Sequence, residues 1–277
     1  MHPLLTALLV ILGIAVLAFG AWLYLICPGR KRREMDRFKT VKYAHRGLHD
    51  AEKPENSLSA FAAAKENGFG IEFDIRLSKD GQLVVFHDST LDRVVGREGK
   101  VIDFTAEELG KMSLNGTQDT IPTLRQVLDL IDGAVPLLIE IKTSMSESGV
   151  AERFIEEIKD YDGEFIVESF NPMALRTVKK ARPDIIRGIL AMRYRDFIGP
   201  TPKPIGLMLE SLCFNFLMRP DFISYDKRGY CVHNLRIIRR SLGTPLIAWT
   251  IKSKEEEEAA ISHGFDTVIF EGYIPEK

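Results

Sequence analysis

Short apolar runs alternate with amphipathic stretches along almost the whole chain after residue 40, and several runs end at a charged residue or a histidine. The apolar runs predict β-strands at Val41–Ala44, Gly70–Leu77, Leu83–Phe86, Pro136–Ile141, Phe165–Ser169, Ile186–Leu190, Phe222–Ser224, Pro245–Thr250 and Thr267–Phe270. The amphipathic stretches predict helices at Ser57–Asn67, Thr123–Ile131, Ala151–Asp160, Pro172–Lys180, Asn234–Ser241 and Ser253–Ser262. Strands that alternate with helices favour a parallel sheet. About eight such repeats fit a closed (β/α)8 barrel of the TIM type, and no glycine-rich dinucleotide motif follows the first strand.

Two regions break this alternation. Residues 89–120 hold no clear barrel strand, so we expect a small insertion after the second strand, over the mouth of the barrel. Residues 193–219 are also irregular, and Ile205–Leu217 is strongly apolar around Glu210. This stretch is either a barrel helix with one buried face or a surface segment that touches lipid.

The first thirty residues have a different composition from the rest of the chain. No charged residue occurs from Leu4 to Cys27, which is enough helix to cross a bilayer, and Trp22 lies near one end. A basic cluster, Arg30 to Arg33, follows rather than precedes this run, which argues against a cleaved signal peptide. We therefore expect a single-pass anchor in the cell membrane with the catalytic domain on the cytoplasmic side.

The predicted domain organisation has three parts: a transmembrane anchor at residues 1–29, a basic linker at 30–40 and a barrel at 41–277 that includes the insertion. The formal net charge is −2, so bulk charge gives no reason to expect binding to nucleic acid. Any anion must be recognised by a local site.

Three carboxylates are placed to share one local site. Glu72 and Asp74 are two residues apart on a predicted strand, so both side chains leave the same face. Glu140 ends another strand, with Lys142 two residues further on. Carboxylates that converge inside a barrel repel one another unless a cation neutralises them, and oxygen ligands suit Mg²⁺ or Ca²⁺. We predict one divalent cation at these three residues.

Two histidines also close apolar runs. His45 follows the first strand and precedes Arg46, and His87 follows Leu83–Phe86 and precedes Asp88. Cleavage of a phosphodiester needs a base for the attacking oxygen and an acid for the leaving alkoxide, and histidine suits both roles. Arg46 and Lys142 are candidates to bind the phosphate oxygens. Asp88 either orients a histidine or caps a turn.

Five segments resemble the glycerophosphodiester phosphodiesterase family: HRG at His45, PENSLSAF from Pro54, GIEFDIRLSKDGQLVVFHD from Gly70, LIEIK from Leu138 and AWTI from Ala248. The match runs in order from about Tyr43 to Pro275. It implies a barrel that hydrolyses glycerophosphodiesters to an alcohol and sn-glycerol 3-phosphate with a bound divalent cation. It further implies that Trp249 is an aromatic wall of the substrate pocket, although a role in the barrel core is the alternative.

The resemblance assigns roles by position: His45 and His87 match the acid and base, Glu72, Asp74 and Glu140 the metal ligands, and Arg46 and Lys142 the phosphate contacts. The chain departs from the family at Phe270-Glu271-Gly272, where a Thr-Asp pair followed by proline is common, so the accepted alcohol stays open. Two other functions remain open: cleavage of membrane lysophospholipids in the manner of a lysophospholipase D, and a membrane sensor that binds phosphodiesters without cleaving them.

Overall fold

Eight parallel strands form a closed barrel in the computed structural model, which describes residues 3–29, 32–143, 148–196 and 201–276. β1 pairs with both β2 and β9, and this double pairing closes the ring. In order around the ring, the strands are β1 (Tyr43–His45), β2 (Gly70–Leu77), β4 (Leu137–Ile141), β5 (Phe165–Ser169), β6 (Arg187–Ala191), β7 (Phe222–Asp226), β8 (Leu246–Ile251) and β9 (Thr267–Phe270). The predicted (β/α)8 barrel is confirmed.

The strand predicted at Leu83–Phe86 lies outside this ring. β3 (Leu83–Val85) runs antiparallel to β2 and pairs with its last residues, Ile75 to Leu77. The parallel arrangement expected from the alternation of strands and helices therefore does not extend to β3. The reason is the short connection, because a turn with Gly81 at φ 75° reverses the chain, whereas parallel strands need a long crossover.

Helices cover the outside of the barrel. They are α3 (Leu58–Glu66), α6 (Leu124–Ile131), α7 (Val150–Glu157), α8 (Pro172–Ala181), α11 (His233–Leu242) and α12 (Lys254–Ser262), with the short η3 (Lys227–Cys231) before α11. Side chains of Ser57, Thr123, Asn171 and Ser253 cap four of them by accepting backbone N–H bonds. Such caps satisfy N–H groups that the first helical turn leaves unpaired, which is why these helices begin close to their predicted starts.

Side chains inside the barrel lie in layers, and the lowest layer is apolar. This barrel floor consists of Tyr43, Leu138, Ile166, Ile186, Phe222, Ile247 and Ile269. Side chains alternate along a strand, so the residue two positions further along also faces the interior. The next layer therefore contains His45, Glu140, Glu168, Trp249 and Glu271. We call it the site layer, together with Glu72 and Asp74 of β2.

The segment expected to be a basic linker packs under the barrel floor. It contains the short helix α2 (Arg32–Met35), while Arg30 and Lys31 lie outside the described residues. Met35 and Phe38 are fully buried against the floor residues. These two side chains exclude water from that end of the barrel and leave the opposite end as the route to the site layer.

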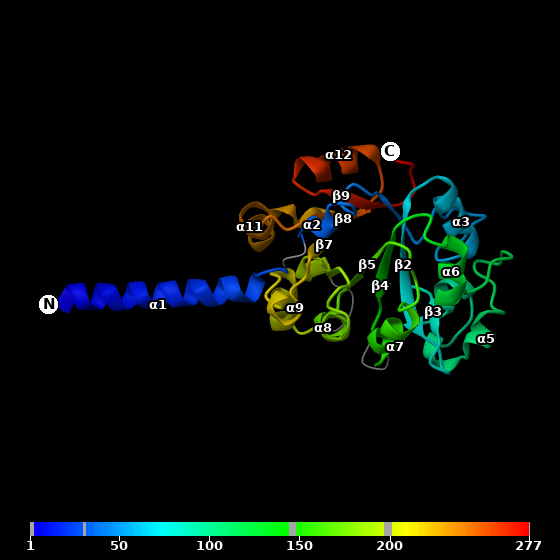
Figure 1. The fold of residues 1–277 in the computed structure, drawn as a ribbon, viewed down its shortest axis with the longest axis horizontal. Coiled ribbons are helices and arrows are strands. Elements are labelled where there is room, and N and C mark those ends of the chain that lie inside the picture. Colours follow the sequence, from blue (N-terminus) through cyan, green and yellow to red (C-terminus); the bar gives the residue numbers. More distant parts are fainter. Residues whose placement is uncertain (1–2, 30–31, 144–147, 197–200, 277) are drawn as a thin grey trace.

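The insertion forms a small lobe with its own core. It contains α4 (Asp92–Val95), the 3-10 turn η1 (Val101–Asp103) and α5 (Ala106–Leu109). Its buried residues pack against Val84 and Phe86, on and just after β3. The lobe lies on the side of the barrel opposite to α1 (Figure 1).

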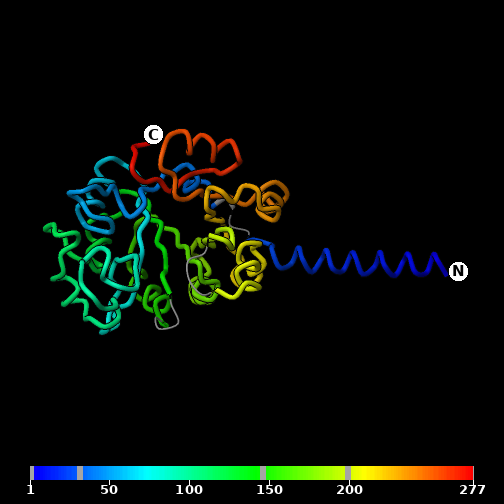
Figure 2. The backbone as a smooth tube through the Cα atoms, turned by 180° about the vertical axis from the view of Figure 1, so that it is seen from behind, coloured from blue at the N-terminus to red at the C-terminus, as the bar shows by residue number. Residues whose placement is uncertain are grey.

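α1 (Pro3–Ile26) projects from the barrel as a long isolated helix in both views (Figures 1 and 2). It is long and apolar enough to cross a membrane by length and composition, a property that signal sequences share. Only its last residues contact the barrel. The Asn215 side chain donates a hydrogen bond to the Ile26 carbonyl, and Arg219 donates to the carbonyls of Tyr24 and Cys27.

The irregular region 193–219 contains η2 (Tyr194–Asp196), α9 (Lys203–Glu210) and α10 (Asn215–Met218), while residues 197–200 lie outside the described residues. α9 exposes Ile205, Leu207 and Met208 to solvent, whereas α10 packs against α8 and the end of α1. The apolar stretch thus divides into an exposed helix and a buried one.

Candidate active site

The predicted site residues meet at the C-terminal ends of the barrel strands. Strand pairing sets His45 beside Glu72. It also sets Asp74 beside Glu140. His45 and Glu140 lie beyond the apolar floor on β1 and β4, and strand pairing brings Glu72 and Asp74 alongside them, so the side chains enter one interior space. The barrel thereby gathers residues that are far apart in the sequence.

Three carboxylates form the centre of this space. Glu72, Asp74 and Glu140 are buried, and one oxygen from each lies within 4.8 Å of the other two. Water does not screen these charges from one another, so their repulsion is strong. An arrangement of oxygen ligands alone fits a hard divalent cation. These three residues could therefore hold a metal ion.

The pKa values in this cluster reveal unbalanced negative charge. Burial, and then the nearby charge of Asp74, raises the pKa of Glu72 well above its usual range. Burial likewise raises the pKa of Glu140 to about 7. For Asp74, the upward effect of burial is outweighed by Lys142 and other nearby cations, which hold its pKa well below the usual range. A divalent cation here would replace protons on Glu72 and Glu140.

Both predicted phosphate-binding cations border the carboxylates. Nζ of Lys142 lies 2.7 Å from Oε2 of Glu140 and 3.1 Å from Oδ1 of Asp74. Arg46 pairs through Nη1 with Oε1 of Glu55 at 2.7 Å. Its backbone N–H also donates to Glu72 at 3.1 Å. Arg46 adopts φ 56°, which costs a residue with a Cβ roughly 1 kcal/mol, and this turn aims the N–H at the carboxylate.

Each predicted catalytic histidine is held through Nδ1 by a carboxylate. Nδ1 of His45 lies 2.6 Å from Oε2 of Glu271, and the other oxygen of Glu271 accepts from Lys252. Nδ1 of His87 lies 2.6 Å from Oδ1 of Asp88. Each carboxylate accepts a hydrogen bond from the Nδ1–H of its histidine, which leaves Nε2 of each ring available to a substrate.

A chain of ion pairs connects Asp88 to the other side of the site. Arg93 of α4 donates to Asp88 at 2.7 Å and to both oxygens of Glu55 at 2.7 Å. Glu55 in turn pairs with Arg46. The insertion lobe thus contributes to the placement of His87 through Asp88. Of the two alternatives for Asp88, orienting a histidine or capping a turn, the structure favours the first, because Asp88 contacts the His87 ring.

Both histidines favour the neutral form in the protein. Burial lowers the pKa of His45 below its usual value, although the hydrogen bond to Glu271 opposes the shift. Burial also lowers the pKa of His87, to about 4, against the attraction of Asp74. Hydrogen bonding to His45 in turn lowers the pKa of Glu271, which stays ionised. Two neutral imidazoles with bare Nε2 atoms therefore face the site near pH 7.

A cavity of about 100 Å³ opens among these residues. Every predicted site residue except Asp74 lines it: His45, Arg46, Glu72, His87, Glu140, Lys142 and Trp249. The Trp249 ring packs edge to face with Phe170 at 5.6 Å between centroids and also contacts the barrel floor. Its Nε1–H is buried and, within the described residues, has no hydrogen-bond partner. Trp249 thus belongs to both the core and the cavity wall.

Sequence reasoning missed two acidic members of the site layer. Glu271 was seen only as a departure from the family pattern, and Glu168 was not singled out. Glu168 is buried beside Glu140 and also lines the cavity, and burial raises its pKa well above the usual range. A signal existed, because each lies two residues beyond an apolar strand position, Ile166 or Ile269, and therefore on its inner face.

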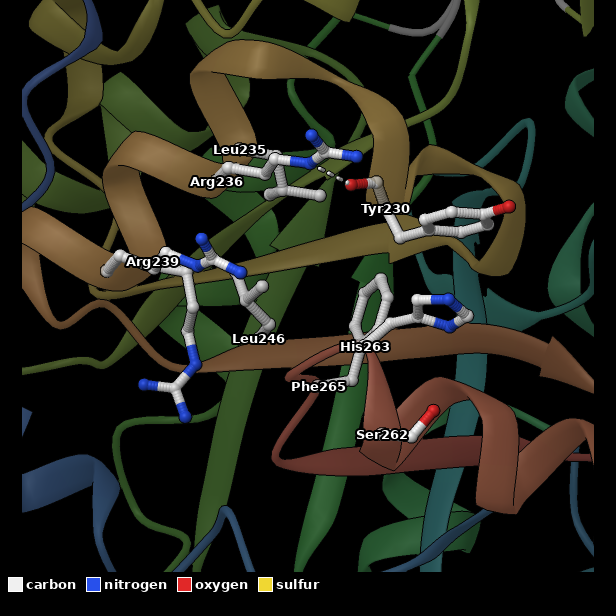
Figure 3. A pocket seen from close by; sticks show the side chains of 9 residues that line it. Tyr230, Leu235, Arg236, Arg239, Leu246, Ser262, His263 and Phe265 are labelled. Atoms are coloured by element: carbon white, nitrogen blue, oxygen red, sulfur yellow. Dashed lines mark hydrogen bonds between the residues drawn. The ribbon is translucent and has the colours of Figure 1, made fainter.

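A second hollow lies on the outer surface, between α11 and α12 (Figure 3). Arg236, Arg239 and Arg240 line it, and the ring of Tyr230 stacks on that of His263 at 3.9 Å. Arg239 is already bound to the Gly264 carbonyl and to Asp266. None of the predicted site residues borders this hollow, so it is separate from the candidate active site.

Known proteins are similar to this chain in sequence and fold. A family profile described as the glycerophosphoryl diester phosphodiesterase family matches residues 45–195. A glycerophosphodiester phosphodiesterase of Caldanaerobacter subterraneus is 37% identical over 83% of this chain and 93% of its own length. Human glycerophosphodiester phosphodiesterase 1 is 31% identical over 82% of this chain and 76% of its own length.

A solved structure agrees with these relatives. A phosphodiesterase from Oleispira antarctica, in complex with the product sn-glycerol-3-phosphate, is 27% identical and superposes with a TM-score of 0.66 over 84% of this chain and 94% of its own. The profile covers more than half of the chain, and the Caldanaerobacter relative spans most of it. This chain is therefore a phosphoric diester hydrolase of the glycerophosphoryl diester phosphodiesterase family.

Proposed function

We propose that this chain is a membrane-anchored phosphodiesterase that uses a divalent cation to hydrolyse glycerophosphodiesters to an alcohol and sn-glycerol 3-phosphate. One observation carries the proposal: two histidines, each with Nδ1 bound to a carboxylate, border the same cavity as a buried cluster of three carboxylates. The names of the relatives and the product bound in the Oleispira enzyme support this substrate class.

The chain's own residues divide the work. His45 and His87 form the acid and base pair: one neutral Nε2 takes the proton of the attacking oxygen, and the other ring, after its Nε2 has bound a proton from solvent, gives that proton to the leaving alkoxide. Arg46 and Lys142 bind the non-bridging phosphate oxygens, and Trp249 walls the pocket. Glu72, Asp74 and Glu140 would hold Mg²⁺ or Ca²⁺, which supplies positive charge to the phosphate when bound.

Alanine variants test this assignment. His45→Ala and His87→Ala should each abolish hydrolysis of glycerophosphocholine while the far-UV circular dichroism stays unchanged, and EDTA should inactivate the parent protein reversibly. His263→Ala, outside the cavity, is the matched control. Near wild-type turnover in either site variant would overturn the catalytic roles. If neither the parent protein nor any variant turned over a diester, another function would be favoured.

We also propose that residues 1–29 anchor the protein, that residues 30–40 connect the anchor to the barrel and that residues 41–277 form the catalytic unit, on the cytoplasmic side, with 89–120 as its cap. The solvent-exposed apolar surface of α1 and the basic residues after it support this topology. Protease added to intact cells should leave the barrel uncut. Digestion of the barrel by external protease would show that the barrel lies outside the cell. Release of the chain from washed membranes would contradict the proposal that residues 1–29 anchor it.

A second candidate function is cleavage of lysophospholipids while they remain in the bilayer. The exposed apolar side chains Ile205, Leu207 and Met208 on α9 favour it, because α9 precedes α10, which contacts α1. Mass spectrometry of products from equal amounts of glycerophosphocholine and lysophosphatidylcholine separates the two. A clear preference for the water-soluble diester would reject the lysolipid function.

A further inference from the structure

We propose that His45, His49 and Glu271 form a second metal site that binds Zn²⁺ and that, when filled, blocks the reaction. One donor atom from each residue lies within 4.8 Å of the others, at the outer side of the site layer. All three are half-buried, so an ion can reach them from solvent. This set is separate from the three carboxylates, although His45 borders both. Its effect on activity rests on the proposed function, whereas metal binding itself does not.

The donor types favour zinc over the cation of the carboxylate cluster. Two imidazoles and one carboxylate are a common ligand set for Zn²⁺, and the fourth position is then left to water. Mg²⁺ and Ca²⁺ prefer oxygen ligands and bind imidazole weakly. The protein thus offers two metal sites of different chemistry on either side of one histidine ring.

Small movements would complete the zinc site. Nδ1 of His45 and Oε2 of Glu271 are 2.6 Å apart and share a proton, whereas ligands around tetrahedral zinc lie about 3.3 Å from each other. These two atoms would separate by less than about 1 Å as the ion takes the place of the proton. His49 would move inward by at most about 1.5 Å from the 4.8 Å limit.

His49 is free to make that movement. Among the described residues it has no hydrogen bond or ion pair, and it lies in the loop between β1 and α3, two residues after the turn at Gly47. A hollow of about 490 Å³ beside it is lined by His49, Glu271 and Tyr273, which gives both space and access. His49 does not border the catalytic cavity, so its side chain has no part in the proposed chemistry.

Zinc on Nδ1 would disable His45 through its ring tautomer. The neutral ring carries a single N–H, and as the metal binds Nδ1 this proton moves, by way of solvent, to Nε2. A neutral Nε2–H has no lone pair to accept a proton, and it is a much weaker acid than an imidazolium. His45 therefore loses either role that the acid and base pair requires. Glu271, now a metal ligand, no longer accepts its hydrogen bond.

The experiment uses the full chain in detergent with millimolar Mg²⁺, so that the carboxylate site is occupied by a hard cation. Isothermal titration with ZnCl₂ should detect one zinc per chain, and X-ray absorption should find two imidazole ligands. His49→Ala should weaken this binding by at least about tenfold, since even partners outside the first ligands change metal affinity by that factor. His263→Ala is the control and should bind zinc as the parent does.

Activity supplies an independent measurement. Zinc should inhibit the parent protein in a way that added Mg²⁺ does not relieve, and His49→Ala should need at least about tenfold more zinc while its activity without zinc is unchanged. Equal zinc sensitivity in parent and His49→Ala, relief by Mg²⁺, or a spectrum without imidazole ligands would each overturn the proposal. If the protein cleaves no phosphodiester at all, the binding measurements still decide the zinc site, and only the proposed function fails.

Discussion

At the scale of single residues, the site depends on hydrogen bonds that fix each histidine ring. His45 depends on Glu271, which lies just beyond the last barrel strand and is itself bound by Lys252. His87 depends on Asp88, its neighbour in the chain. One partner is local and the other comes from the far end of the sequence. The two rings can therefore be disturbed separately.

Replacing Glu271 with glutamine should lower kcat more than it changes KM. The amide can still contact Nδ1 but no longer carries the charge that favours proton transfer to His45, so we expect a loss within the roughly 10²–10⁴-fold that acid and base catalysis contributes. Glu258→Gln, on the exposed surface of α12, is the control. A Glu271→Gln enzyme with unchanged kcat, or with a change in KM alone, would show that Glu271 does not position His45 for catalysis.

Trp249 offers a test of substrate binding. Trp249→Phe keeps an aromatic ring against Phe170 but removes the unpartnered Nε1–H at the cavity. If that donor binds substrate, the loss of one hydrogen bond of about 0.5–1.5 kcal/mol should raise KM by about 2–12-fold with little change in kcat. Steady-state kinetics on glycerophosphocholine measure both constants. Trp22→Phe, in α1, is the control, and an unchanged KM in Trp249→Phe would remove this role.

At the scale of elements, the antiparallel turn of β3 explains how His87 reaches the site. β2 continues past its pairing with β4, and β3 returns along this free end until the Phe86 N–H donates to the Asp74 carbonyl. His87 is the next residue. The lobe that follows then packs on β3 and supplies Arg93 to hold Asp88. An insertion that interrupts the alternation of strands and helices is therefore part of the support of the site.

Arg93→Ala should lower catalytic activity without lowering the stability of the fold. Arg93 is 49% exposed, so its ion pairs contribute at most about 1 kcal/mol to the free energy of unfolding. Its loss frees both Asp88 and Glu55, and we expect kcat to fall several-fold while the urea midpoint barely moves. Arg97→Ala, which removes a cation–π contact with Phe104 in the same lobe, should leave kcat unchanged. Equal kcat values in Arg93→Ala and Arg97→Ala would contradict the proposed role of Arg93 in supporting the site.

At the scale of the whole molecule, the barrel concentrates acidic residues in an interior that water does not screen. The apolar floor, sealed by Met35 and Phe38, lies directly below the site layer. Burial there raises the pKa of Glu140 from 4.5 in the unfolded chain to about 7. The protonated carboxyl stabilises the metal-free fold below about pH 4.5, and this contribution is lost as the pH rises through about 7.

Metal should therefore matter more at higher pH. Below about pH 7, Mg²⁺ must displace a proton from Glu140, so each lower pH unit should weaken binding by up to about tenfold. Differential scanning fluorimetry should find that millimolar Mg²⁺ raises Tm more at pH 8 than at pH 6, and that EDTA reverses the gain. Glu140→Gln should lose most of the Mg²⁺ effect at both values, whereas Glu258→Gln should keep it. An equal Mg²⁺ effect at pH 6 and pH 8 in the parent protein would argue against a protonated Glu140 in the metal-free site.

The sequence by itself determined the barrel, the carboxylates and the histidines, because these depend on periodicity within single strands. Alternation along β2 requires Glu72 and Asp74 to share a face, and apolar runs closed by polar residues mark the strand ends. Only the tertiary structure decided which residues meet across strands. The contact of Glu271 with His45 follows from ring closure, which brings the first and last strands together. Glu168 lies beside Glu140 because β4 pairs with β5, and Phe38 packs beneath the floor formed by several strands. Pairing between distant segments leaves no local periodic signal, so the partners of His45 became visible only in the closed barrel.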